Sequence, residues 1–108
     1  MTVFIILCKV HALTNEFMPA SISKAFVNCY THADSYEEAG KKVLNQLTND
    51  GIHLDEIISP IYEMPVQNWE THIKEQYKNL SPQMLTQSEF ESAIAEDKVV
   101  YGIFGGFN

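Results

Sequence analysis

The chain has 108 residues, of which 14 are acidic and 7 are lysine with no arginine, so its formal charge is −7. This length has room for one ordinary domain, and the 45% of apolar residues can build its core. We therefore expect a single domain over residues 1–108. The acidity and the missing guanidinium groups argue against nucleic acid and against anionic membranes, because cationic side chains supply most of both affinities.

The N-terminal segment is apolar but lacks the basic residues and the cleavage site of a signal peptide, so residues 1–8 predict a strand. Elsewhere no apolar stretch approaches the roughly 20 residues that a membrane helix needs. A cytoplasmic protein is expected on these grounds. In a reducing compartment, Cys8 and Cys29 are expected to be buried free thiols.

The first half of the chain predicts two strands and a helix. Residues 3–12 and 25–32 are rich in β-branched and aromatic side chains, and the stretch between them, 13–24, is typical of a long loop. Ser35 and Glu38 have the spacing of a capping box, so a helix should begin near Tyr36. Its apolar positions recur at helical spacing up to Leu47, and Gly51 predicts its end.

The second half predicts a strand, two helices and a last strand. Residues 52–62 are strand-like, but Pro60 lacks an N–H, which places that strand at an edge or at a bulge. A helix follows with an apolar stripe at Trp69, Ile73, Tyr77 and Leu80. A shorter helix over 88–96, opened by Ser88 with Glu91, precedes a strand over 99–104. The glycines from Gly102 onward are expected to let this strand turn or approach another backbone closely.

The order of these elements, ββαβααβ, predicts an α+β fold. We expect a two-layer sandwich, with a mainly antiparallel sheet of about four strands. Right-handed connections would place the two main helices and the short helix on one face of that sheet.

The other face of the predicted sheet is also partly apolar. Alternation along the first strand places Val3, Ile5 and Leu7 opposite Phe4 and Ile6, and the second strand presents aromatic and polar side chains together. Such a face is covered by the 13–24 loop or by a second copy of the chain in a homodimer, or it docks a partner. The sequence leaves these alternatives open.

Two Cys-x-x-His patterns, Cys8 with His11 and Cys29 with His32, contain the ligand types of a zinc site. Residues three apart on a strand point to opposite faces, so these pairs do not converge without a bulge. The interpretation is buried thiols and partly exposed imidazoles, with no metal and no cofactor.

A possible catalytic group consists of side chains that the alternation places on the outer sheet face near strand ends: Lys9, His11, Tyr30 and His32. Such groups can act as general acids and bases. No nucleophile motif surrounds them, and whether the protein is an enzyme stays open, with the balance toward no catalytic residue.

The acidity is concentrated in the second part of the chain, since residues 34–108 carry a net charge of −8 and residues 1–33 a charge of +1. We therefore expect a non-catalytic protein-binding module, an inhibitor or immunity-type protein that neutralises a basic partner such as a nuclease toxin. One alternative is a small dimeric enzyme or small-molecule binder that uses the outer sheet face; another is a structural or regulatory subunit that docks through it. The expected partner-binding residues are Asp34, Glu37, Glu38, Asp55, Glu56, Glu70, Glu75, Glu89 and Glu91.

Overall fold

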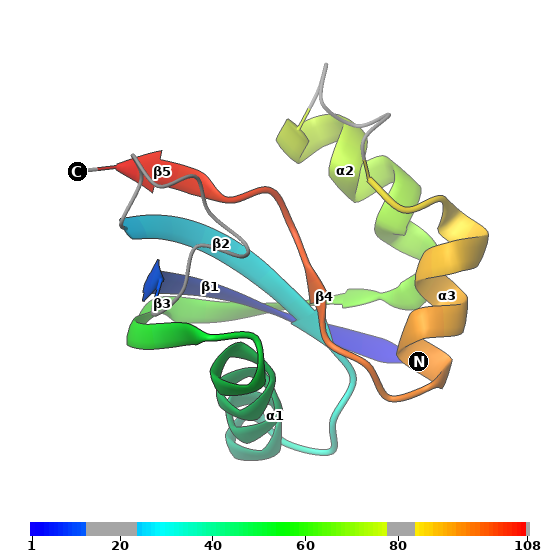
Figure 1. The fold of residues 1–108 in the computed structure, drawn as a ribbon. Helices are drawn as coiled ribbons and strands as arrows, with labels where there is room; N and C mark the ends of the chain where they lie inside the picture. The colour runs from blue at the N-terminus through cyan, green and yellow to red at the C-terminus, as the bar shows by residue number, and fades with distance from the viewer. Residues whose placement is uncertain (13–23, 78–83, 108) are drawn as a thin grey trace.

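The computed structural model describes residues 1–12, 24–77 and 84–107 (Figure 1). The α+β class, the antiparallel sheet, the three helices and the order ββαβααβ are confirmed. The sheet order is β3-β1-β2-β4, with a short β5 that also pairs with β2. The strands are β1 (Thr2–Ala12), β2 (Lys24–Thr31), β3 (Ile52–Pro65), β4 (Val100–Tyr101) and β5 (Gly105–Phe107). The helices are α1 (Tyr36–Asn49), α2 (Trp69–Tyr77) and α3 (Gln87–Ala95), and a 3-10 turn, η1 (Val66–Asn68), leads into α2.

The first helix begins and ends where its sequence signals predict. The Ser35 hydroxyl accepts a hydrogen bond of 3.2 Å from the backbone N–H of Glu38. Beyond the last turn, Gly51 adopts a φ of 74°, in the left-handed region that favours glycine. Between these ends, the helix buries Ala39, Val43 and Leu47 against the sheet.

The third helix begins one residue earlier than predicted and with a different cap. Thr86, and not Ser88, is the N-cap: its hydroxyl accepts from the N–H of Glu89, whose carboxylate accepts from the N–H of Thr86. This is a complete capping box. The spacing of a capping box occurs twice in this stretch of the sequence, at Thr86 with Glu89 and at Ser88 with Glu91. The end of the second predicted helix, Leu80, lies outside the described residues.

The helices occupy both faces of the sheet, so the expectation that all three lie on one face is wrong. Figure 1 shows α1 on one side, with α2 and α3 on the other. The handedness rule governs connections between parallel strands, and it applies to α1, because β2 and β3 are both antiparallel to β1. It does not constrain α2 and α3, which connect β3 to a strand that runs antiparallel to it. The odd-numbered residues in the first half of β1 are apolar, which favours their burial, and α2 and α3 lie on the face of the sheet that carries them.

The two cores that result are built from alternate residues of the same strands. Phe4, Ile6, Cys8 and Val10 pack with the buried face of α1. On the opposite face, Val3 and Tyr30 pack with Trp69 and Phe90, whose rings stack at 4.0 Å. Because each strand contributes to both cores, the first half of β1 is apolar on both sides.

The long strand β3 lies at an edge of the sheet and is irregular, as Pro60 predicts. In the pairing with β1, Ile5 lies opposite Tyr62 and Leu7 opposite Ile58, so residues 59–61 face the single residue Ile6. The proline therefore sits within a bulge, where no ladder hydrogen bond is required from it.

Of the last strand predicted over residues 99–104, only Val100–Tyr101 forms a strand, β4, and β5 begins just beyond the predicted end, at Gly105. The Gly102 N–H donates to the backbone oxygen of Asn28 at 2.7 Å. A Cβ on Gly102 would lie 2.2 Å from the Tyr77 hydroxyl, so only glycine fits this close approach. The expected close approach of backbones is confirmed at Gly102.

Both cysteines are free and buried on the face covered by α1. Ile6 pairs with Cys29 across the strands, so the Cys8 thiol is a diagonal neighbour of the Cys29 thiol. A hydrogen bond with Cys8 and burial together raise the pKa of the Cys29 thiol well above its usual range. Within the described ranges, no group of three or more potential ligands is placed to hold a metal ion. No described helix has the length and apolar character needed to cross a membrane.

Candidate functional site

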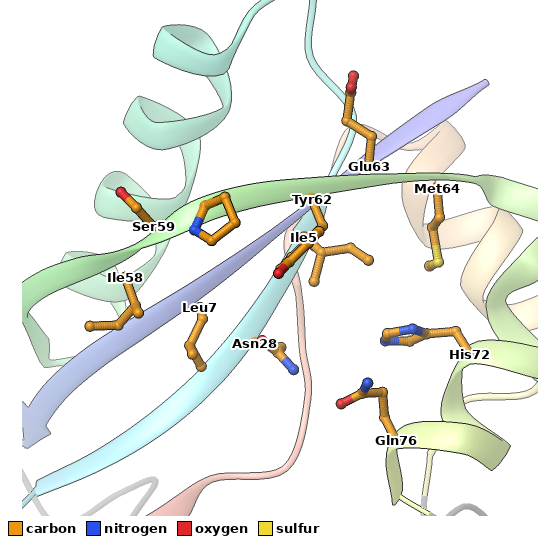
Figure 2. A pocket seen from close by; sticks show the side chains of 11 residues that line it. Ile5, Leu7, Asn28, Ile58, Ser59, Tyr62, Glu63, Met64, His72 and Gln76 are labelled. Carbon is orange, nitrogen blue, oxygen red and sulfur yellow. The ribbon is translucent and has the colours of Figure 1, made fainter.

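The sheet face that α2 and α3 cover in part, which we call the outer face, carries a pocket of about 710 Å³ beside α2 (Figure 2). Ile5 and Leu7 of β1 and Asn28 of β2 form its floor. The edge strand β3 forms one wall, over residues 58–64. His72 and Gln76 of α2 form the opposite wall.

Local sequence periodicity positions each of these side chains. Leu7 pairs with both Asn28 and Ile58, so the three side chains form a row across the outer face of the sheet. His72 and Gln76 are four residues apart and therefore share one face of α2. The pocket thus lies between the uncovered part of the sheet and one helix face.

A row of hydrogen bonds, which we call the polar row, connects β2 to α2 beside the pocket. The Asn28 side-chain N–H donates to the Tyr77 hydroxyl at 3.3 Å. The hydroxyls of Tyr77 and Tyr30 are 2.9 Å apart, and the Tyr30 hydroxyl is 2.8 Å from Nε2 of His72. The ring of Tyr30 is wholly buried and meets Trp69 edge to face at 5.0 Å.

The polar row is electrically neutral near pH 7. Burial and the hydrogen bond with Tyr77 raise the pKa of the Tyr30 hydroxyl far above its usual range, so it stays protonated. Burial lowers the pKa of the His72 imidazole, an effect that the carboxylate of Glu75 opposes. The His72 ring is therefore uncharged at neutral pH.

The rest of the pocket is also uncharged where a ligand would sit. Among the described residues that line it, none is a lysine, and the one carboxylate is that of Glu63. That carboxylate accepts a hydrogen bond from Tyr36 of α1, and Figure 2 shows it directed away from the pocket. An apolar floor with a few neutral polar groups at one end suits binding of an uncharged molecule.

The possible catalytic group is not brought together. Tyr30 pairs with Ile5, whereas His11 pairs with Lys24, six residues farther along β1. At the rise of a strand, this separates Tyr30 from His11 by roughly 20 Å. His11 instead bonds Asp55 at 2.8 Å, and His32 bonds the backbone oxygen of Thr2 at 2.7 Å. Of that group, which also included Lys9, Tyr30 alone belongs to the polar row.

The expected partner-binding acids lie on different sides of the molecule. Asp34, Glu37 and Glu38 lie at the start of α1, Asp55 and Glu56 on β3, and Glu70, Glu75, Glu89 and Glu91 on α2 and α3, across the sheet from α1.

Part of this charge is engaged within the molecule. Asp55 bonds His11, Glu70 pairs with Lys74 at 2.9 Å, Glu89 caps α3, and Glu91 accepts from Gln87 at 2.8 Å. Over the described part of the chain, no ion pair or hydrogen bond engages the carboxylates of Asp34, Glu37, Glu38, Glu56 and Glu75, which are exposed.

Sequence reasoning missed most of this site, namely Asn28, His72, Gln76 and Tyr77. The signal was available for Asn28, a polar residue in the middle of an apolar strand. For His72 the signal was weaker: it directly precedes Ile73 in the apolar stripe of α2, so a half-buried position was predictable. Whether Asn28 and His72 join one row of hydrogen bonds with Tyr30 depends on which face of the sheet α2 covers.

No protein-family model, no curated protein and no solved structure matches this chain. Its function is therefore inferred from the geometry of the molecule itself.

Proposed function

We propose that the protein binds a small molecule without transforming it, in the pocket on the outer face of the sheet. The observation that carries the proposal is the polar row at the end of an open apolar pocket. Ligand sites typically have volumes of about 300–1,000 Å³ and combine an apolar lining with a few fixed polar groups. The pocket of about 710 Å³ has this size and composition.

Two features favour binding over catalysis. The Tyr30 hydroxyl is held in its protonated form by burial, so it is a poor general base. Its partner His72 is already engaged through Nε2.

Tyr62 lies at the rim of the pocket and is 62% exposed, so a bound ligand would bury part of its ring.

Fragment screening by NMR tests this proposal. With ¹⁵N-labelled protein, we expect neutral aromatic fragments to shift the amide signals of Leu7, Asn28, Ile58 and Gln76. Leu7→Lys places a charge on the pocket floor and should abolish these shifts. The matched control is Leu44→Lys, because Leu44 is 45% exposed on α1, on the other side of the sheet. Shifts that survive Leu7→Lys, or no shifts at all, contradict the proposal.

A second candidate is the acidic binding module, an inhibitor or immunity-type protein directed at a basic partner. The observation that favours it is the group of exposed carboxylates Asp34, Glu37 and Glu38 at the start of α1, added to a net charge of −7. Such charges raise association rates with a basic protein, and salt weakens the effect.

A pull-down from the source cell at low and moderate salt tests the second candidate. We expect one basic protein, whose association slows as salt rises and in the variant Glu37→Gln with Glu38→Gln. The control is Glu75→Gln, on the opposite side of the sheet. Recovery of no basic protein at either salt concentration counts against this function.

A further inference from the structure

We infer that the pocket presents one fixed hydrogen-bond donor, the Nδ1–H of His72, and therefore selects neutral, flat, apolar ligands that carry an acceptor such as a carbonyl oxygen. This inference rests on the proposed small-molecule-binding function. It adds to that function the direction of the polar row and the class of ligand that the direction demands.

The direction follows from counting protons. Tyr77 receives a hydrogen bond from the side-chain N–H of Asn28, and each hydroxyl has one proton to donate. If Tyr77 donates to Tyr30, and Tyr30 donates to Nε2 of His72, every bond has a donor and an acceptor. In the reverse order His72 donates to Tyr30 and Tyr30 to Tyr77, and the proton of Tyr77 then has no acceptor among the described residues.

The complete burial of Tyr30 restricts the partners of its own proton to neighbouring side chains. Its side chain is 0% exposed, so water does not supply a partner for its proton. The acceptors within reach are the Tyr77 oxygen at 2.9 Å and the His72 nitrogen at 2.8 Å. When Tyr77 uses its proton on Tyr30, the order in which every proton of the row has an acceptor among the described residues, the proton of Tyr30 goes to His72.

The consequence for His72 is a defined tautomer. A neutral imidazole has one N–H, and because Nε2 accepts from Tyr30, the proton resides on Nδ1. Within the described part of the chain, Nδ1 has no hydrogen-bond partner, and the ring lines the pocket (Figure 2). The wall opposite β3 thus presents a donor whose partner must come from a ligand or from water.

The other lining groups restrict the ligand further. A bound anion would find no lysine among the described lining residues, which favours an uncharged molecule. The amide of Asn28 is held by its bond to Tyr77, whereas the amide of Gln76 can donate or accept, so Gln76 adapts to the ligand and does not set its class. The apolar floor at Ile5 and Leu7 suits a flat hydrocarbon body.

The tautomer is tested in the unmodified protein by long-range ¹H–¹⁵N correlation spectra of histidine-labelled samples. We expect His72 to show a protonated-type Nδ1 and a pyridine-type Nε2. Tyr30→Phe should remove this preference, and Tyr77→Phe, which retains the Tyr30 donor, should preserve it. A protonated Nε2 would mean that the row runs the other way, with the Tyr77 proton donated to water or to a turned Asn28 oxygen, which overturns the inference.

The ligand class is tested with three bicyclic probes of similar size: 1-indanone, which has an acceptor, indane, which has neither group, and indole, which has a donor. In NMR titrations, we expect 1-indanone to bind roughly two- to tenfold more tightly than indane, the range for one hydrogen bond. His72→Phe should bring this ratio close to one.

The outcomes separate the two claims. If none of the probes shifts the pocket amides, the proposed function fails. If the probes bind in the pocket with equal affinity, or if indole binds most tightly, the function stands and the inference about the donor is wrong. If His72→Phe does not fold, the tautomer measured in the unmodified protein still decides.

Discussion

Replacing Tyr30 with phenylalanine isolates the polar row from the packing around it. The change removes one oxygen and leaves the ring, so the edge-to-face contacts with Trp69 and Phe90 persist. It breaks two hydrogen bonds, of 2.8 Å to His72 and 2.9 Å to Tyr77. The net contribution of an internal hydrogen bond is about 0.5–1.5 kcal/mol. Because the two partners are half-buried and regain water in part, we expect Tyr30→Phe to lower the free energy of unfolding by about 1–3 kcal/mol.

Urea denaturation followed by circular dichroism measures this loss. With a slope near 2 kcal/mol per molar urea, a loss of about 2 kcal/mol lowers the midpoint by about 1 M. The slope itself should not change, since the variant exposes the same surface on unfolding. The matched control is Tyr62→Phe, whose side chain is 62% exposed and whose loss should stay within about 0.5 kcal/mol. Equal effects of the two substitutions would refute the polar row as a stabilising element.

Three further predictions test individual features of the fold. Because the pKa of His72 is lower in the folded protein, the unfolded chain binds more protons, and the free energy of unfolding should fall as the pH drops below about 6.5. In a plot of the urea midpoint against pH, His72→Gln should make the decrease below about pH 6.5 less steep. Gly102→Ala places a Cβ 2.2 Å from the Tyr77 hydroxyl and should lower the free energy of unfolding by about 1–3 kcal/mol, whereas Gly40→Ala, with its nearest neighbour at 3.9 Å, should raise it by up to about 1 kcal/mol. Thermal melting should show shifts in the same directions. Thr86→Ala removes the cap of α3 at a cost of about 0.5–2 kcal/mol, and a larger loss on Ser88→Ala in the same denaturation assay would contradict the observed capping box.

Local signals in the sequence determine most of the elements. The Ser35 cap, the apolar period of α1 and Gly51 bound one helix within a residue or two, because each acts through contacts only a few residues apart. Pro60 predicts the edge position of β3 for an equally local reason, its missing N–H. Where two capping patterns overlap, as at Thr86 and Ser88, local rules alone do not choose between them.

The side of the sheet on which α2 and α3 lie depends on contacts distant in sequence. The connection from β3 to β4 joins antiparallel strands, so no handedness rule fixes it. The apolar residues Val3 and Ile5 indicate that the second face is covered, but not by which segment. The site could not be predicted for the same reason, since the polar row joins Tyr30 to residues more than 40 positions away.

The lengths of the elements explain why a pocket is left beside this row. The 11 residues of β1 extend over roughly 36 Å, whereas the 9 residues of α2 cover about 14 Å. The helices therefore cover one end of the outer face and leave the floor around Leu7 accessible. At the boundary, Tyr30 is buried with a hydroxyl that must be bonded, and α2 supplies both partners. The bonds that complete the second core thus also orient His72, so that its remaining N–H is available to the pocket.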